Sequence, residues 1–177
     1  MCDMPWGRRW LGVAGALVLA CGLAGCAHSV SVRPEAVRSL EGNLAALAPT
    51  VSAAEAQRVA ACAWEASQQL AEEYGAVRPP VFHNLLVNLR LKRRGLCYHW
   101  AEDLAARLRE LELATLDLHW GIARAGRWRE HNSVVVTARG QPFQEGLVLD
   151  SWRHSGELHW ARVAADRYPW VEADWNP

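Results

Sequence analysis

The sequence has no excess of charge of either sign, because lysine plus arginine and aspartate plus glutamate each number 19 among 177 residues. A strongly basic nucleic-acid-binding protein is therefore excluded, since no surplus positive charge is available to neutralise phosphates. Hydrophobic types make up 51% of the chain and charged types only 21%, which excludes a disordered polar segment. No internal repeat or low-complexity tract is present. Length and composition predict one domain with a sizeable core.

The sequence also lacks a hydrophobic run of the about 20 residues that a membrane-spanning helix needs. The longest run, residues 11–23, follows Arg8 and Arg9, and this order is typical of a secretory signal. The run ends in Leu-Ala-Gly-Cys at residues 23–26, which resembles a bacterial lipobox. The resemblance implies cleavage before Cys26 and attachment of lipid to its thiol and new amino group. The alternative is an ordinary cleaved signal that leaves Cys26 as a free thiol.

The residue after the lipobox cysteine is Ala27, where an aspartate tends to hold lipoproteins of enteric bacteria at the inner membrane. Its absence favours the outer membrane. We therefore expect a cell-envelope protein that faces the periplasm and is attached to the lipid bilayer through Cys26. The predicted organisation is a signal peptide at 1–25, a lipid-anchored tether at 26–50 with one short helix near 35–48, and a folded domain at 51–177.

The order of elements predicts an α+β fold, in which N-terminal helices pack on an antiparallel sheet. A capping-box pattern, Ser-Ala-Ala-Glu at 52–55, begins a helix that runs to residue 73. A second helix starts after Pro79, and a third opens at Cys97 after the break at Gly95. The apolar stripe expected on the second helix consists of Val81, Leu85, Leu86 and Leu89. Strands are predicted over residues 113–123, 131–138, 147–150 and 158–163.

Cysteine becomes scarce once the signal is removed, since only Cys62 and Cys97 remain besides the lipidated residue. The two could form a disulfide in an oxidising periplasm. They could equally be one buried and one reactive thiol. The neighbours of Cys62 at helical spacing suit a small buried thiol. The position of Cys97 in the first turn of a helix favours ionisation, because unpaired N–H groups there carry partial positive charge.

The residues Cys97, His131 and Asp150 occur in an order that suits a thiol enzyme. A cysteine nucleophile needs a histidine base within hydrogen-bond distance and a carboxylate or amide that orients the ring. If His131 and Asp150 face each other in a hairpin, its symmetry point falls between residues 140 and 141, inside the expected turn. A longer turn would make the two residues diagonal neighbours, still within reach of each other.

This pattern of Gly-x-Cys at a helix start, His at a strand start and Leu-Asp at the end of the next strand resembles the transglutaminase-like branch of the papain-like cysteine peptidases. The resemblance covers about residues 93–152. It implies a papain-like core with Cys97 as nucleophile, His131 as general base and Asp150 as the orienting residue. It implies a thiol hydrolase or acyltransferase that acts on amide bonds, without a cofactor. Glu130 replaces the aromatic residue often found before the histidine.

The same resemblance implies an oxyanion hole made by the backbone N–H of the cysteine and an upstream side-chain donor. Asn84 or Asn88 could supply that donor, and local capping or solvent contact is the alternative. Three tryptophans adjoin the proposed triad in the sequence, and they could form cleft walls or simply pack in the core: Trp100, Trp120 and Trp152. The envelope location makes peptides, including the stem peptides of peptidoglycan, natural substrates.

Two other functions are compatible with the sequence. One is a catalytically inactive lipoprotein that binds or assembles envelope components on the same fold, and a disulfide between Cys62 and Cys97 would favour it. The other is a metal-dependent hydrolase with His119, His131 and Asp150 as ligands. No His-x-x-x-His or Cys-x-x-Cys spacing occurs, so we expect no metal.

Overall fold

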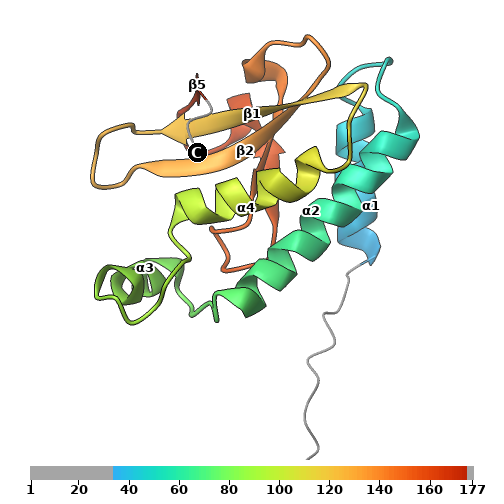
Figure 1. The fold of residues 1–177 in the computed structure, drawn as a ribbon. Coiled ribbons are helices and arrows are strands. Elements are labelled where there is room, and N and C mark those ends of the chain that lie inside the picture. Colours follow the sequence, from blue (N-terminus) through green and yellow to red (C-terminus); the bar gives the residue numbers. More distant parts are fainter. Residues whose placement is uncertain (1–33, 175–177) are drawn as a thin grey trace, which may run out of the picture.

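A computed structural model describes residues 34–174, which form an α+β fold as the sequence predicts. Helices pack beneath an antiparallel sheet, and one short helix lies apart from them at the lower end of the molecule (Figure 1). The expected signal peptide and Cys26 lie outside the described residues. Among residues 34–174, no helix is long and apolar enough to cross a membrane.

Four α-helices precede the first strand, with bounds α1 Pro34–Ala45, α2 Ala53–Glu73, α3 Pro80–Asn88 and α4 Cys97–Arg109. The Ser52 side chain caps α2 and accepts a hydrogen bond from the Glu55 N–H at 3.4 Å. The Glu55 carboxylate instead accepts backbone N–H bonds from Ala114 and Thr115 at 2.9 and 2.8 Å. This residue therefore joins the start of α2 to the segment that enters the sheet.

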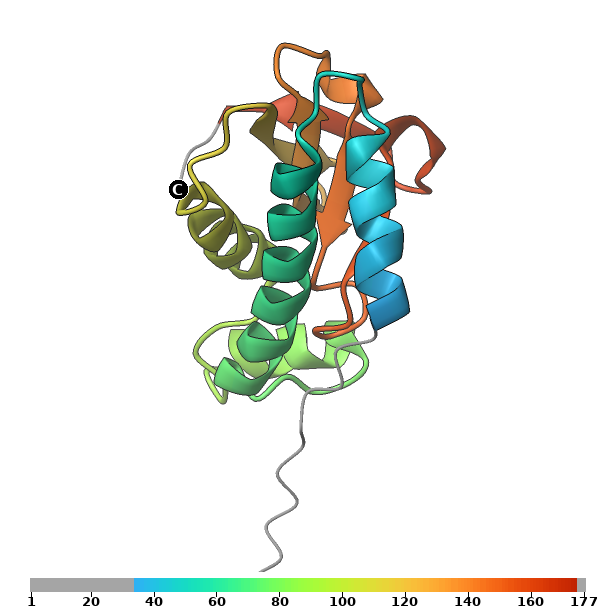
Figure 2. The same ribbon diagram turned by 90° about the vertical axis from the view of Figure 1, so that its right-hand side faces the viewer.

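Helix α1 is part of the domain core, although it falls within the stretch expected to be a tether. Leu40 and Leu44 are fully buried and pack in the same cluster as the apolar face of α2. Figure 2 shows α1 and α2 side by side along the molecule. The prediction that the folded domain begins at residue 51 was wrong for this reason, since the fold already includes Pro34–Ala45.

Five strands form one antiparallel sheet in the order β4-β3-β2-β1-β5. Their bounds are β1 Leu116–Ala123, β2 His131–Ala138, β3 Leu147–Asp150, β4 His159–Arg162 and β5 Trp170–Ala173. The four predicted strands are confirmed. The strand β5 was not predicted from the sequence; it has four residues and pairs with the outer edge of β1.

The central strand β2 is buried along its whole length, because both faces of the sheet are covered. On the helix side, Val134 and Val136 join the main core with α2 and α4. On the opposite side, Val135 packs in a smaller cluster with Phe143, Val148, Val163 and Trp170. Because both of its faces are covered, β2 is held rigidly in place. His131 is the first residue of this strand.

The hairpin of β2 and β3 is centred between residues 141 and 142, because Val134 pairs with Leu149. This is one position later than direct pairing of His131 with Asp150 requires. The connection contains a 3₁₀ turn, Phe143–Glu145, which lengthens it. The two residues are consequently diagonal neighbours, which is the arrangement expected for a longer turn.

The turn after β3 packs tightly on α2 and carries residues of the site. The Ser151 and Ser67 hydroxyls are 2.6 Å apart, and Gln68 donates to the Gly156 carbonyl at 2.8 Å. Gly156 has a φ of +100°, and a Cβ at this position would lie 2.3 Å from the Ala71 Cβ. Only glycine fits this contact without displacing the backbone.

Helix α3 is fixed to the chain before α4 by His83, whose side chain is buried. The His83 Nδ1 accepts the Val77 N–H at 3.2 Å, and Nε2 lies 3.0 Å from the Arg94 carbonyl. A Cβ on Gly95 would lie 2.2 Å from the same ring. The apolar stripe expected on this helix is largely exposed, because α3 turns His83 inward and leaves Val81, Leu85 and Leu89 at the surface.

Candidate active site

The nucleophile candidate, Cys97, is the first residue of α4, as the sequence predicts. His99 caps the N-terminus of this helix, because its Nδ1 accepts hydrogen bonds from the N–H groups of Gly95 and Leu96 at 3.1 and 3.2 Å. Burial, together with the nearby Arg94 charge, lowers the pKa of His99 below its ordinary value. The His99 ring is therefore a neutral cap of α4.

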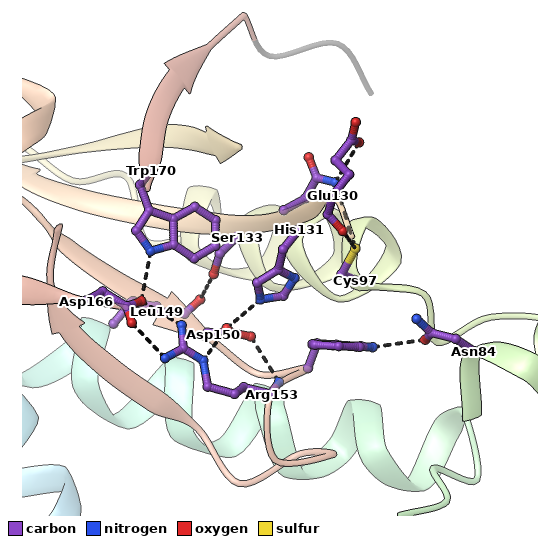
Figure 3. Close-up of polar contacts among 12 residues, drawn as sticks. Asn84, Cys97, Glu130, His131, Ser133, Leu149, Asp150, Arg153, Asp166 and Trp170 are labelled. Carbon is purple, nitrogen blue, oxygen red and sulfur yellow. Dashed lines mark hydrogen bonds and ion pairs between the residues drawn. The ribbon is translucent and has the colours of Figure 1, made fainter. Parts of the chain in front are cut away.

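The imidazole of His131 is bound to the Asp150 carboxylate, with 2.6 Å between Nε2 and Oδ2 (Figure 3). A carboxylate only accepts hydrogen bonds, so Nε2 carries the proton and Nδ1 is the basic nitrogen. In Figure 3, Nδ1 faces the Cys97 sulfur. This buried nitrogen has no hydrogen-bond partner among residues 34–174. The structure thus brings the three predicted residues together in the order thiol, imidazole, carboxylate.

The charged forms of Cys97, His131 and Asp150 stabilise one another. Burial disfavours the thiolate, but interactions with His131 and Asn132 together outweigh it and lower the pKa of Cys97. Burial likewise opposes the imidazolium, but the Asp150 charge raises the pKa of His131 to about 9. Despite complete burial, the pKa of Asp150 is lowered by His131 and Arg153. These directions favour a thiolate–imidazolium pair near neutral pH.

Arg153 braces the carboxylate from its other side, a contact that sequence analysis missed. Its Nε donates to Asp150 Oδ2 at 2.9 Å, and its backbone N–H donates to Oδ1 at 3.0 Å. Its two terminal nitrogens bind Asp166 at 2.9 and 2.6 Å, and Trp170 Nε1 donates to the same carboxylate at 2.8 Å. The three ionic side chains are at most 4% exposed. Asp150 is therefore held in one position by a bidentate ion-pair chain.

Three aromatic rings enclose the imidazole and fix its plane. The ring centroids of Trp152, Tyr168 and Trp170 lie 4.7, 4.8 and 5.3 Å from that of His131. Tyr168 also stacks with the Arg153 guanidinium at 4.9 Å. The ring of His131 is only 2% exposed. Packing and the Asp150 bond together hold Nδ1 in its direction toward the sulfur.

Two asparagines present amide NH₂ groups to the site, and each is oriented by an indole. The Trp120 indole donates to the Asn132 oxygen at 3.0 Å, and the Trp152 indole donates to the Asn84 oxygen at 3.0 Å. An indole is a donor only, so each amide must turn its oxygen toward it and its nitrogen away. Asn132 Nδ2 lies 3.8 Å from the Cys97 sulfur. Asn132 is a second residue that sequence analysis missed, although it directly follows the predicted histidine.

A cavity of about 360 Å³ opens in front of the thiol. Its walls come from α3, the start of α4, the β1–β2 loop and the turn after β3. The lining residues are Val81, Asn84, Leu85, Asn88, Cys97, Arg124, Trp128, Arg129, Glu130, His131, Trp152 and Tyr168. Both proposed oxyanion residues, Asn84 and Asn88, border this cavity. The Asn84 oxygen accepts the Trp152 indole N–H, which fixes the orientation of this amide (Figure 3).

The three tryptophans predicted as cleft walls have different positions. Trp152 lines the cavity. Trp100 is buried in the core, where its indole donates to the Gly95 carbonyl and its ring packs edge-on against Tyr74, so its prediction was wrong. Trp120 packs against the main core and is not among the cavity-lining residues. It contributes to the site by donating a hydrogen bond that orients Asn132.

Two features that would favour the alternative functions are absent from residues 34–174. Cys62 and Cys97 are both free thiols, so no disulfide blocks the nucleophile. His119 lies apart from the triad and contacts Glu172 at 2.6 Å and Thr137 at 2.9 Å. Within the described part of the chain, no group of three or more His, Cys, Asp or Glu residues could hold a metal ion.

Comparison with known proteins adds no relative. No protein-family model, no curated protein and no solved structure matches this chain.

Proposed function

We propose that this protein is a thiol hydrolase or acyltransferase of the transglutaminase-like, papain-like kind, which acts on amide bonds of peptides or cell-wall peptides. One observation carries the proposal: the buried Nδ1 of His131 faces the Cys97 sulfur without another partner, while Nε2 is bound to Asp150. We further propose that the enzyme is anchored at the outer membrane by lipid on Cys26. The lipobox-like segment that ends at this residue supports the anchor.

In the first half of the reaction, the Cys97 thiolate attacks the carbonyl carbon of the amide. The carbonyl π electrons move to oxygen, and the backbone N–H of Cys97 and the Asn84 amide NH₂ are the available donors for this oxyanion. The His131 imidazolium then gives its Nδ1 proton to the leaving amine as the C–N bond breaks. The products are a free amine and a thioester on Cys97.

In the second half, water or an acceptor amine attacks the thioester and His131 Nδ1 takes its proton. The C–S bond breaks, which releases a carboxylic acid or a new amide and regenerates the thiolate–imidazolium pair. Asp150 stays ionised throughout and stabilises the imidazolium, while Arg153 holds that carboxylate in place. The half-open cavity leaves room for either nucleophile to reach the thioester.

The direct test is to trap the thioester. The protein is mixed with peptides from digested peptidoglycan and with model peptide amides, and the reaction is quenched in acid. The mass of the intact protein is then measured by mass spectrometry. An acyl adduct that maps to Cys97 is expected for the wild type and for the Cys62→Ser control, and none for Cys97→Ser. If no substrate yields an adduct while Cys97 remains a free thiol, the proposal of amide chemistry fails. Addition of a primary amine separates transfer, which gives a new amide, from hydrolysis.

A further inference from the structure

Exposed apolar side chains gather on one element of the domain. Among residues 34–174, eight large hydrophobic residues are exposed, and five of them lie on α3 or just after it. Their exposed fractions run from 45% to 68%, and the residues are Val81, Phe82, Leu85, Leu89 and Leu91. We call these five the α3 surface. Isolated exposed residues need no explanation, but a cluster on one helix marks a site of interaction.

Positive charge accompanies the α3 surface. Residues 78–94 contain five basic residues and no acidic one, in a chain whose total charge is balanced. Arg78 lies 3.7 Å from Glu157, Lys92 donates to the Gly75 carbonyl, and Arg94 is engaged by Glu102 and Asp103. Arg90 and Arg93 are exposed beside Leu89 and Leu91. Leucine and phenylalanine side chains flanked by arginine are typical of helices that lie in the interface of an anionic bilayer.

The position of the α3 surface in the fold also favours contact with a membrane. Helix α3 and the N-terminal end of α1 lie at the same end of the molecule in both ribbon views (Figures 1 and 2). Cys26 precedes Pro34 by eight residues, which span at most about 28 Å when fully extended. A lipid on Cys26 would therefore keep this end of the domain close to the membrane.

We propose that the α3 surface docks on an anionic lipid bilayer. Val81 and Leu85 belong both to this surface and to the wall of the Cys97 cavity. Across the cavity, the 93%-exposed Trp128 and its neighbour Arg129 add a second apolar and basic edge. Docking thus places the cavity next to the lipid headgroups, where it meets substrates that are held at the membrane. The closeness of this end of the domain to the membrane depends on the proposed lipid on Cys26, whereas the α3 surface does not.

The test uses the expected mature chain, residues 26–177 with Cys26→Ser, so that no attached lipid contributes to binding. Sedimentation with vesicles of phosphatidylglycerol and phosphatidylethanolamine measures partition, and phosphatidylcholine vesicles are the uncharged comparison. We expect binding to the anionic vesicles that weakens at high salt. The double variants Leu85→Ser/Leu89→Ser and Arg90→Glu/Arg93→Glu should each lose roughly tenfold or more in partition.

Val171→Ser is the matched control, because this residue is 51% exposed on β5, away from α3. It should partition as the wild type does. Circular dichroism verifies that each variant is folded. If the leucine variant unfolds, the arginine variant alone tests whether the α3 surface binds the vesicles. Failure of the wild type to bind anionic vesicles overturns the proposal, and so does equal binding by all the variants. Because neither substrate nor Cys97 chemistry is involved, this failure is distinct from failure of the catalytic proposal.

Discussion

Replacement of Arg153 by methionine would remove the only cation that contacts both Asp150 and Asp166 in the described structure. Methionine keeps much of the side-chain length, so the main change is the loss of charge and hydrogen bonds. Asp150 and Asp166 would then be two buried carboxylates, with one imidazole and one indole as their remaining side-chain donors besides backbone N–H groups such as that of residue 153. Breaking a buried ion pair from one side costs about 3–5 kcal/mol, because an uncompensated charge is left behind. We expect the free energy of unfolding at pH 7 to fall by that amount.

This cost should depend on pH in a defined direction. In the wild type the pKa of Asp166 is lowered to about 2, chiefly by Arg153 acting against the effect of burial, and the pKa of Asp150 is also lowered. Their contribution to stability is present above the unfolded carboxyl pKa of about 4 and is lost as pH falls toward 2. In Arg153→Met these pKa values rise, so the variant takes up protons that the wild type does not. The difference in stability should shrink below about pH 5.

Urea unfolding of both proteins at pH 7 and at pH 4.5 measures the two differences. Arg78→Met is the matched control, because Arg78 is 66% exposed and lies 3.7 Å from Glu157, so its loss should cost under about 1 kcal/mol. In an Asp166→Asn background, Arg153→Met should cost less than in the wild type. A cost below about 1 kcal/mol at pH 7, or one unchanged at pH 4.5, would refute the reasoning.

Single contacts at Asn132 and Gly156 should have smaller, separate effects. Asn132→Ala removes an NH₂ donor 3.8 Å from the sulfur, so the pKa of Cys97 should rise, as measured by alkylation against pH. No rise would show that this amide does not stabilise the thiolate. Gly156→Ala adds a Cβ 2.3 Å from the Ala71 Cβ at a φ of +100°, so unfolding free energy should fall by about 3 kcal/mol or more. Gly140→Ala is its control, with a φ of +75° but open space, and should cost only about 1 kcal/mol.

Much of the fold was predictable because its signals are local. The serine at 52 caps α2, and β2 and β3 begin and end where the sequence analysis placed them. The position of Cys97 at the start of α4 followed from the glycine break before it. The diagonal relation of His131 and Asp150 depended on the length of one turn, which the 3₁₀ segment at 143–145 sets.

The parts that could not be predicted depend on tertiary packing. Helical spacing shows that α3 has an apolar stripe, but not that His83 turns inward and leaves Leu85 and Leu89 exposed. Likewise, adjacency to a triad residue in sequence did not place Trp100, because its indole reaches a backbone carbonyl in the core. The brace formed by Arg153 requires a partner 13 residues away, and no sequence spacing signals such a bond.

The most direct test of the central claim is the pH dependence of Cys97 alkylation in a Cys62→Ser background, with and without His131→Ala. Cys97→Ser gives the blank, and circular dichroism verifies the fold of each variant. The thiolate–imidazole pair predicts a rate that rises with an apparent pKa well below the ordinary thiol value of about 8.5, and a shift to higher pH when His131 is lost. A thiol that titrates near or above 8.5 in both proteins would contradict a working Cys97–His131 pair.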